Sequence, residues 1–211
     1  MFNTLKIKVF GMRQGDNINA IAALLPDYLG FIFYDKSPRY IGDDYAPSNM
    51  QRLPECIQRT GVFVNDTEER IAQMVERYAL NAVQLHGHES VALCRKVSQM
   101  GVEVIKAFQV DVHFDFSILE GYDEACDYYL FDTKTKGYGG SGHKFDWNML
   151  KQYNNRKPIF LSGGITCEDV ESIQKMSYLN IYAVDINSKF ETEPALKDVA
   201  LVSAFVSKLR K

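Results

Sequence analysis

The sequence predicts a single (β/α)8 barrel, and two observations lead to this fold class. Short apolar runs of strand length recur about eight times along the 211 residues, and segments with helical spacing of apolar residues separate most of them. Nearly continuous apolar strands joined by helices are typical of a parallel sheet that is buried on both faces. About eight such units in a chain of this length fit one closed barrel over residues 1–211.

The expected strands are apolar, β-branched or aromatic at most positions, and the expected helices carry apolar residues three and four positions apart. The strands are expected at residues 5–10, 28–33, 61–64, 82–85, 103–108, 128–131, 158–161 and 181–184. The helices are expected at residues 17–25, 67–79, 89–100, 145–152 and 167–175. Residues 110–120 depart from the pattern, and we expect an irregular segment with one short helix there.

An open doubly wound sheet is the competing arrangement. Such sheets commonly carry a glycine-rich dinucleotide fingerprint after the first strand, and no Gly-x-Gly-x-x-Gly follows the first run here. The strand and helix repeat also continues evenly to the end of the chain, without a linker or low-complexity tract. Both observations favour the closed barrel.

Composition and charge limit the class of protein. The net charge is −3, and the absence of a Lys/Arg-rich block argues against a nucleic-acid partner. No apolar run approaches the roughly 20 residues of a membrane span, and the first residues lack a signal-peptide core, so we expect a cytoplasmic protein. The cysteines at 56, 94, 126 and 167 form no Cys-x-x-Cys pair, which argues against disulfides and a zinc site. We therefore expect no metal.

One carboxylate stands at a position typical of catalysis. Asp132 follows the aromatic run at 128–131 and precedes a glycine-rich loop at 133–143. Catalytic groups of (β/α)8 barrels lie at the carboxyl ends of the strands, so Asp132 is a candidate catalytic acid. Aspartate also caps turns frequently, and this stretch alone leaves both interpretations open.

Two further loops suit a phosphate group, which commonly binds after strands seven and eight of such barrels. Gly163 and Gly164 follow the seventh run, where they allow close approach of the backbone to an anion, and we expect the free amides of the next helix to point at it. Asn187 and Ser188 follow the eighth run and are candidate donors to the same phosphate. Either loop alone is also compatible with an ordinary turn, and the pair favours a binding site.

Two side chains are candidates for the rest of the pocket. Arg39 is expected to project, exposed, from a turn stiffened by Pro38, with a planar fork suited to a carboxylate. His86 ends the fourth run and is either a structural histidine or a pocket wall that hydrogen-bonds a substrate. We interpret His88 and His143 as solvated loop residues.

Six segments, in register over essentially the whole chain, resemble phosphoribosylanthranilate isomerase of tryptophan biosynthesis. They are Lys-Val-Phe-Gly-Met-Arg at 8–13, Gly-Phe-Ile-Phe-Tyr-Asp-Lys-Ser-Pro-Arg at 30–39, Gln-Leu-His-Gly at 84–87, Phe-Asp-Thr-Lys at 131–134 with Gly-Gly-Ser-Gly-His-Lys-Phe-Asp-Trp at 139–147, Leu-Ser-Gly-Gly-Ile at 161–165 and Val-Asp-Ile-Asn-Ser at 184–188. The resemblance implies a (β/α)8 enzyme that works as a monomer or a homodimer without metal or cofactor.

The resemblance also implies a reaction and roles for residues. The reaction is the Amadori rearrangement of N-(5′-phosphoribosyl)anthranilate to its 1-deoxyribulose isomer. Asp132 matches the general acid that protonates the ribose ring oxygen, and Arg39 matches the residue that holds the anthranilate carboxylate. The phosphate site of the family matches Gly163, Gly164, Asn187 and Ser188.

The chain departs from the family at the first strand. The family has Lys-Val-Cys-Gly there, with the cysteine as the base that removes the C2′ proton, and Phe10 occupies that position. Phenylalanine accepts no proton, so we expect low activity unless another group, conceivably Asp185, replaces the base. Two hypotheses follow: an isomerase of reduced activity, or a catalytically silent barrel that binds phosphosugars as a scaffold or regulator.

Overall fold

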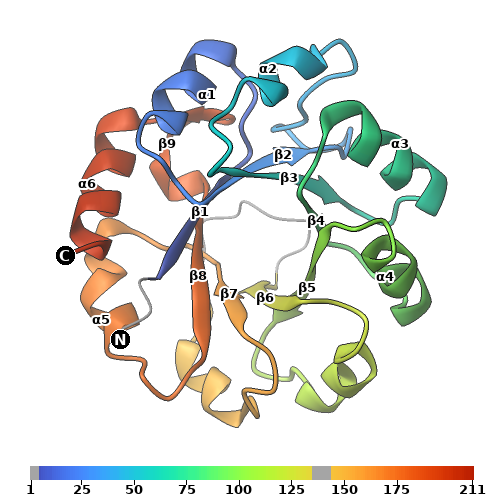
Figure 1. The fold of residues 1–211 in the computed structure, drawn as a ribbon. Coiled ribbons are helices and arrows are strands. Elements are labelled where there is room, and N and C mark those ends of the chain that lie inside the picture. Colours follow the sequence, from blue (N-terminus) through green and yellow to red (C-terminus); the bar gives the residue numbers. More distant parts are fainter. Residues whose placement is uncertain (1–4, 135–143) are drawn as a thin grey trace.

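The computed structural model describes residues 5–134 and 144–211, and it shows a closed barrel of eight parallel strands (Figure 1). Each strand pairs with the next one along the chain, and β8 returns to pair with β1 through the register Lys8 with Asp185. The expected fold class is therefore confirmed. The strands are β1 (Lys6–Phe10), β2 (Tyr28–Ile32), β3 (Gln58–Phe63), β4 (Ala82–Leu85), β5 (Glu103–Val110), β6 (Tyr128–Thr133), β7 (Ile159–Leu161) and β8 (Ile181–Ile186).

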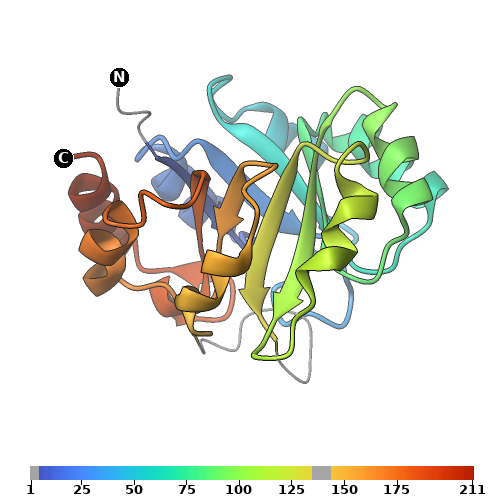
Figure 2. The same ribbon diagram turned by 90° about the horizontal axis from the view of Figure 1, so that it is seen from below.

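Helices surround the barrel, and the strands all run toward one rim, which is the lower rim in Figure 2. Of the α-helices, α3 begins at a cap in which the Thr67 side chain accepts from Arg70 N–H, and α4 begins at a similar cap formed by Ser90. The helices are α1 (Gly15–Ala22), α2 (Pro47–Gln51), α3 (Glu68–Tyr78), α4 (Val91–Ser98), η1 (Phe116–Tyr122), η2 (Trp147–Gln152), η3 (Cys167–Asp169), α5 (Val170–Gln174), η4 (Ser188–Phe190) and α6 (Val199–Leu209).

Several expected helices differ from those observed. Residues 145–152 form only the 3₁₀ helix η2, and residues 167–175 divide into η3 and the short α5. Sequence analysis did not predict α2, nor α6, although α6 buries Val202, Phe205, Val206 and Leu209 at helical spacing. It also missed a hairpin of two short strands after β8, β9 (Glu191–Glu193) and β10 (Leu196–Lys197), because strands this short carry no periodic signal.

The interior of the barrel changes from apolar to polar toward the carboxyl ends of the strands. The layer near the amino ends is aromatic and aliphatic, with Tyr28, Leu130 and Phe160 fully or almost fully buried. The next layer contains polar side chains, among them Lys8 and Gln84, which have no exposed surface. Because a buried polar group requires a partner, this layer is where a functional network is expected.

Within residues 5–134 and 144–211, we find no helix with the length and apolar composition needed to cross a membrane.

Candidate active site

Asp132 lies at the carboxyl end of β6, 7% exposed, inside the mouth of the barrel. Its Oδ1 accepts a hydrogen bond of 2.9 Å from Thr133 N–H and lies 3.5 Å from the Ser162 hydroxyl. Its Oδ2 lies 3.5 Å from Nε2 of His86, the residue that follows β4. The groups around the carboxylate therefore come from three places: β6 itself, the end of β4 and the end of β7. Protein encloses the carboxylate on most sides.

The glycine pair after β7 shares this mouth with Asp132. Gly163 and Gly164 have φ of +93° and +64°, a left-handed conformation that favours glycine. A Cβ atom on Gly163 would lie 2.5 Å from Thr133 Oγ1 and 3.4 Å from Asp132 Oδ1. The structure thus places the candidate acid and the candidate phosphate loop side by side at one mouth, as the barrel prediction required.

The helix after this loop differs from the expected anion-binding helix start. Its first amides are engaged locally, because Thr166 N–H donates to Asp169 Oδ2 at 2.8 Å and Glu168 N–H donates to Thr166 Oγ1 at 3.3 Å. The element is also only a 3₁₀ turn before α5. The expectation of free amides at the helix start was therefore wrong for Thr166 and Glu168.

Arg39 is buried, which corrects the expectation of an exposed side chain. Its exposed fraction is 8%, and its guanidinium binds the Glu191 carboxylate through Nε, at 2.9 and 3.0 Å, and through Nη2, at 2.7 Å. Nη1 takes no part in this contact. Gly11, at φ +77°, lies against the arginine stem, and a Cβ there would approach Arg39 Cδ to 2.7 Å. Sequence analysis missed Glu191 because a single acidic residue at the start of a very short strand has no distinguishing local pattern.

Lys197 links Glu191 to the second candidate phosphate loop. Its Nζ donates to Glu191 Oε1 at 2.5 Å and to Asn187 Oδ1 at 2.8 Å. Burial lowers the pKa of Lys197 to about 8, against the opposing effect of Glu191. Burial also works to raise the pKa of Glu191, but the hydrogen bonds from Arg39 and the charge of Lys197 hold that pKa below its ordinary value. Ser188, half-buried, begins η4 beside Asn187.

A second polar cluster lies deeper in the barrel, beneath Asp132. Lys8 Nζ donates to Asp185 Oδ2 at 3.0 Å and to Gln84 Oε1 at 2.5 Å, and Gln84 Nε2 lies 2.6 Å from His86 Nδ1. Burial raises the pKa of Asp185 to about 6 although Lys8 opposes the shift, and burial lowers the pKa of Lys8. The Asp185 side chain has no exposed surface, so in this conformation it is closed to a ligand.

Phe10 lies in the barrel interior near the carboxyl ends of the strands. It is 4% exposed and packs with Ile32 and Val62, and Lys8 Nζ lies 4.6 Å from the centre of its ring. A small pocket beside His86 is lined partly by this ring. The phenyl group therefore belongs to the packed core of the barrel mouth and offers no proton acceptor there.

Sequence analysis also missed Lys8, Gln84 and Lys197. A signal was present for Lys8 and Gln84, since each is a polar residue within an otherwise apolar strand at an inward-facing position. For Lys197 the local sequence offers no comparable indication. Most of the expected glycine-rich loop at 133–143, residues 135–143, lies outside the described residues.

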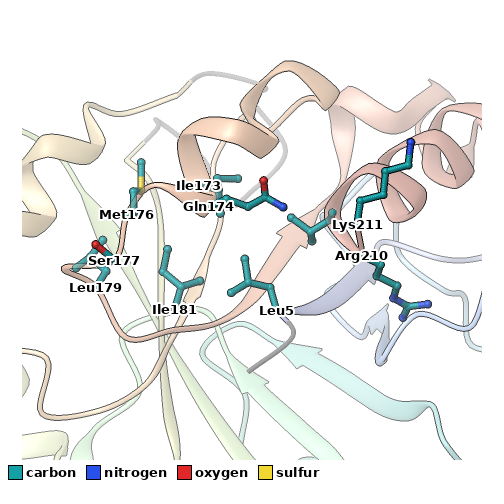
Figure 3. Close-up of a pocket in the computed structure, with 10 residues that line it drawn as sticks. Leu5, Ile173, Gln174, Met176, Ser177, Leu179, Ile181, Arg210 and Lys211 are labelled. Carbon is teal, nitrogen blue, oxygen red and sulfur yellow. The ribbon is translucent and has the colours of Figure 1, made fainter. Parts of the chain in front are cut away.

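A pocket of about 500 Å³ lies at the opposite end of the barrel (Figure 3). Its lining includes Leu5, which precedes β1, and Ile181, which begins β8, so it opens at the amino ends of the strands. Active sites of (β/α)8 barrels lie at the other end. Among residues 5–134 and 144–211 there is also no cluster of His, Cys, Asp or Glu that would hold a metal ion.

Comparison with known proteins agrees with this geometry. The family model for N-(5′-phosphoribosyl)anthranilate isomerase matches residues 7–208. The chain belongs to this family. The curated isomerase of Phocaeicola vulgatus is 41% identical over 97% of this chain and 98% of its own, and that of Thermotoga maritima is 37% identical over 96% and 97%.

Solved structures of the family superpose on the whole chain. The Thermotoga maritima phosphoribosylanthranilate isomerase has a TM-score of 0.87 at 36% identity, covering 97% of this chain and 98% of that one. Another, solved with reduced 1-(o-carboxyphenylamino)-1-deoxyribulose 5-phosphate, has a TM-score of 0.84 at 33% identity and the same coverage. A third structure shows monomers generated from the dimeric isomerase of Thermotoga maritima; it has a TM-score of 0.80 at 32% identity and covers 97% of this chain and 98% of that one.

Proposed function

We propose that this chain catalyses the Amadori rearrangement of N-(5′-phosphoribosyl)anthranilate, with Asp132 as the general acid. The observation that supports this assignment is the closeness of Asp132 to Gly163 at one mouth, where a Cβ added to Gly163 would lie 3.4 Å from the carboxylate. An acid beside a backbone anion cradle suits a sugar phosphate whose ring oxygen must be protonated. Family membership supplies the substrate that joins these features.

The substrate lies across the mouth between two anion sites. Its phosphate binds the backbone at Gly163 and Gly164, with Asn187 and Ser188 on the opposite side. Its anthranilate carboxylate binds Arg39 through the guanidinium edge that contains Nη1, since Nε and Nη2 already bind Glu191. Charge supports this pose, because Arg39 and Lys197 together exceed the single negative charge of Glu191 by one.

The first chemical step is ring opening. Asp132 transfers its proton to the ribose ring oxygen, the bond between that oxygen and C1′ breaks, and the anthranilate nitrogen lone pair forms a double bond to C1′. The products of the step are a protonated imine, a hydroxyl at C4′ and the Asp132 carboxylate. Loss of the C2′ proton then gives an enolamine, and reprotonation at C1′ with loss of the enol proton gives the ketone.

Phe10 makes removal of the C2′ proton the difficult step. The ring has no lone pair to accept a proton, and the Asp185 side chain is enclosed below it beside Lys8. Proton abstraction then falls to solvent. A positioned general base contributes about 10²- to 10⁴-fold, so we expect turnover of this chain to be lower by a factor of that order than with cysteine at position 10.

The test is the loss of substrate fluorescence with this chain, with Phe10→Cys and with Phe10→Ala. Phe10→Cys is expected to gain about 10²-fold or more in kcat, whereas Phe10→Ala, which opens the same space without a base, is expected to gain little. Asp132→Asn in the Phe10→Cys background is expected to abolish turnover while the reduced product analogue still binds. The assignment is refuted if Phe10→Cys shows no isomerase activity, or if Asp132→Asn leaves its rate unchanged.

A catalytically silent barrel that binds phosphosugars is the second candidate. The observation that favours it is the tight packing of Phe10 on Ile32 and Val62, which gives the mouth a stable apolar wall where the family has its base. If this second candidate is correct, calorimetry detects binding of the reduced product analogue, but the chain shows no turnover. Phe10→Cys then gains no turnover either.

We further propose that the protein acts in the cytoplasm as a monomer or a homodimer. The four cysteines are unpaired in the structure, which supports a reducing compartment. Sedimentation equilibrium distinguishes the two assembly states.

A further inference from the structure

A continuous line of buried polar side chains crosses the barrel beneath the mouth, from Asp185 through Lys8 and Gln84 to His86. We infer that this line holds the ring proton of His86 on Nε2, so that His86 donates to Asp132 as that residue loses its proton. Lys8 and Gln84 are then positioning residues for the reaction. The inference rests on the proposed function for the role of Asp132, whereas the position of the His86 proton is independent of it.

The argument begins at Lys8, whose side chain has no exposed surface. Its Nζ lies 3.0 Å from Asp185 Oδ2 and 2.5 Å from Gln84 Oε1. A protonated lysine only donates. If the proton lay on Asp185 instead, the hydroxyl of that acid would occupy the single lone pair of the amine, and the amine would still donate to Gln84. The Gln84 oxygen is therefore the acceptor in both protonation states of the pair.

This contact determines which way the Gln84 amide points. With Oε1 facing Lys8, the amide nitrogen faces His86 and lies 2.6 Å from its Nδ1. An amide nitrogen has hydrogens and no available acceptor, so Nδ1 must be unprotonated to receive one. This excludes the imidazolium and the tautomer with a proton on Nδ1. The remaining ring proton of His86 is on Nε2.

The protonated nitrogen faces Asp132. His86 Nε2 is buried and has no hydrogen-bond partner among the described residues, and Asp132 Oδ2 lies 3.5 Å from it. The other oxygen of Asp132 already accepts from Thr133 N–H at 2.9 Å. The acid proton accordingly belongs on Oδ2. When this proton passes to the substrate, negative charge appears on Asp132 Oδ2. The Nε2–H group of His86 already faces this oxygen and donates to it as the charge forms.

The opposite tautomer would work against the reaction. It would turn the lone pair of Nε2 toward Asp132 Oδ2, and two acceptors would then face one another as the carboxylate forms. Gln84 is fully buried and cannot touch a ligand, so its effect on the reaction must act through His86. Its effect is expected on the rate of proton transfer and not on substrate affinity.

The first test needs no variant. The protein is labelled with ¹⁵N-histidine, and long-range ¹H–¹⁵N correlation spectra are recorded at pH values from neutral to mildly alkaline, with His86→Asn used to assign the signals. We expect His86 to show a protonated Nε2 and a bare Nδ1, as a single tautomer. A protonated Nδ1, or the mixture of tautomers typical of solvated histidines, overturns the inference.

The second test replaces the amide donor. Gln84→Glu presents only acceptors to His86 Nδ1, so we expect a proton on Nδ1 in the spectrum and, in the active Phe10→Cys background, a kcat at least about tenfold lower with KM nearly unchanged. Gln58→Glu, at the amino end of β3, is the matched control and is expected to change neither. An unchanged tautomer in Gln84→Glu overturns the inference. A tautomer shift in Gln84→Glu combined with an inactive Phe10→Cys supports the inference and refutes the proposed function.

Discussion

Glu191→Gln tests the buried ion-pair cluster that Glu191 forms with Arg39 and Lys197. The Glu191 side chain is 4% exposed and lies between Lys197, with no exposed surface, and Arg39, at 10%. Its carboxylate accepts from both cations and from Ala195 N–H at 3.2 Å. Removal of its charge leaves two buried cations without a counter-charge. Breaking a buried pair in this way costs about 3–5 kcal/mol, and because glutamine keeps one oxygen acceptor we expect about 3 kcal/mol.

Urea unfolding at neutral pH, followed by circular dichroism and by the fluorescence of the single tryptophan, Trp147, measures this loss. Glu193→Gln is the matched control, because Glu193 is exposed in the same hairpin, and its effect is expected within about 0.5 kcal/mol. Adding Lys197→Met to Glu191→Gln removes one uncompensated cation and is expected to restore at least about 1 kcal/mol. A Glu191→Gln loss no greater than that of the control would refute the reasoning.

The pH dependence of the same difference has a definite sign. The pKa of Glu191 is held below its ordinary value of 4.5, so its ionised form is favoured in the folded protein. The stability that it contributes is fully present above that ordinary value and is lost as the pH falls through the lowered one. The difference between wild type and Glu191→Gln should therefore shrink in acid.

Two other predictions concern affinity and acid stability. Arg39→Ala is expected to weaken binding of the reduced product analogue by about 1.5–3 kcal/mol in calorimetry, with the exposed Arg13→Ala as control, and an unchanged affinity would place Arg39 outside the site. Asp185 has its pKa raised from 3.8 to about 6, so the folded state holds its proton more firmly and the contribution of Asp185 to stability declines as the pH rises through that window. Asp185→Asn should remove this decline from the unfolding free energy measured between those pH values. If the unfolding free energy of the variant falls with pH as steeply as that of the wild type, the decline does not come from Asp185.

Much of the site was predictable because barrel topology converts order in the sequence into position in space. Asp132 and Gly163 are far from distinctive alone, but both follow buried strands, and parallel strands of one barrel end at one rim. Their closeness in the structure is the result of that rule. The same rule does not say how deep a side chain lies, which is why Asp185 was considered as a base although it is enclosed beside Lys8.

The burial of Arg39 could not be predicted, because it depends on a residue 152 positions away. A local pattern describes the turn from which an arginine projects, and it contains no information on the carboxylate that draws the side chain inward. Phe10 is a similar case. Its identity was evident from the sequence, whereas its packing on Ile32 and Val62 depends on two other strands.

The sequence by itself determined the number, order and direction of the eight barrel strands, and the chemical groups that stand at their ends. Both are local properties, since hydrophobic periodicity and residue type are contained in short stretches of chain. Only the tertiary structure decided which charges neutralise one another, which acids are closed to a ligand and which nitrogen of His86 faces Asp132. These depend on distances of about 3 Å between side chains from separate strands, and close packing determines such distances only when the barrel closes.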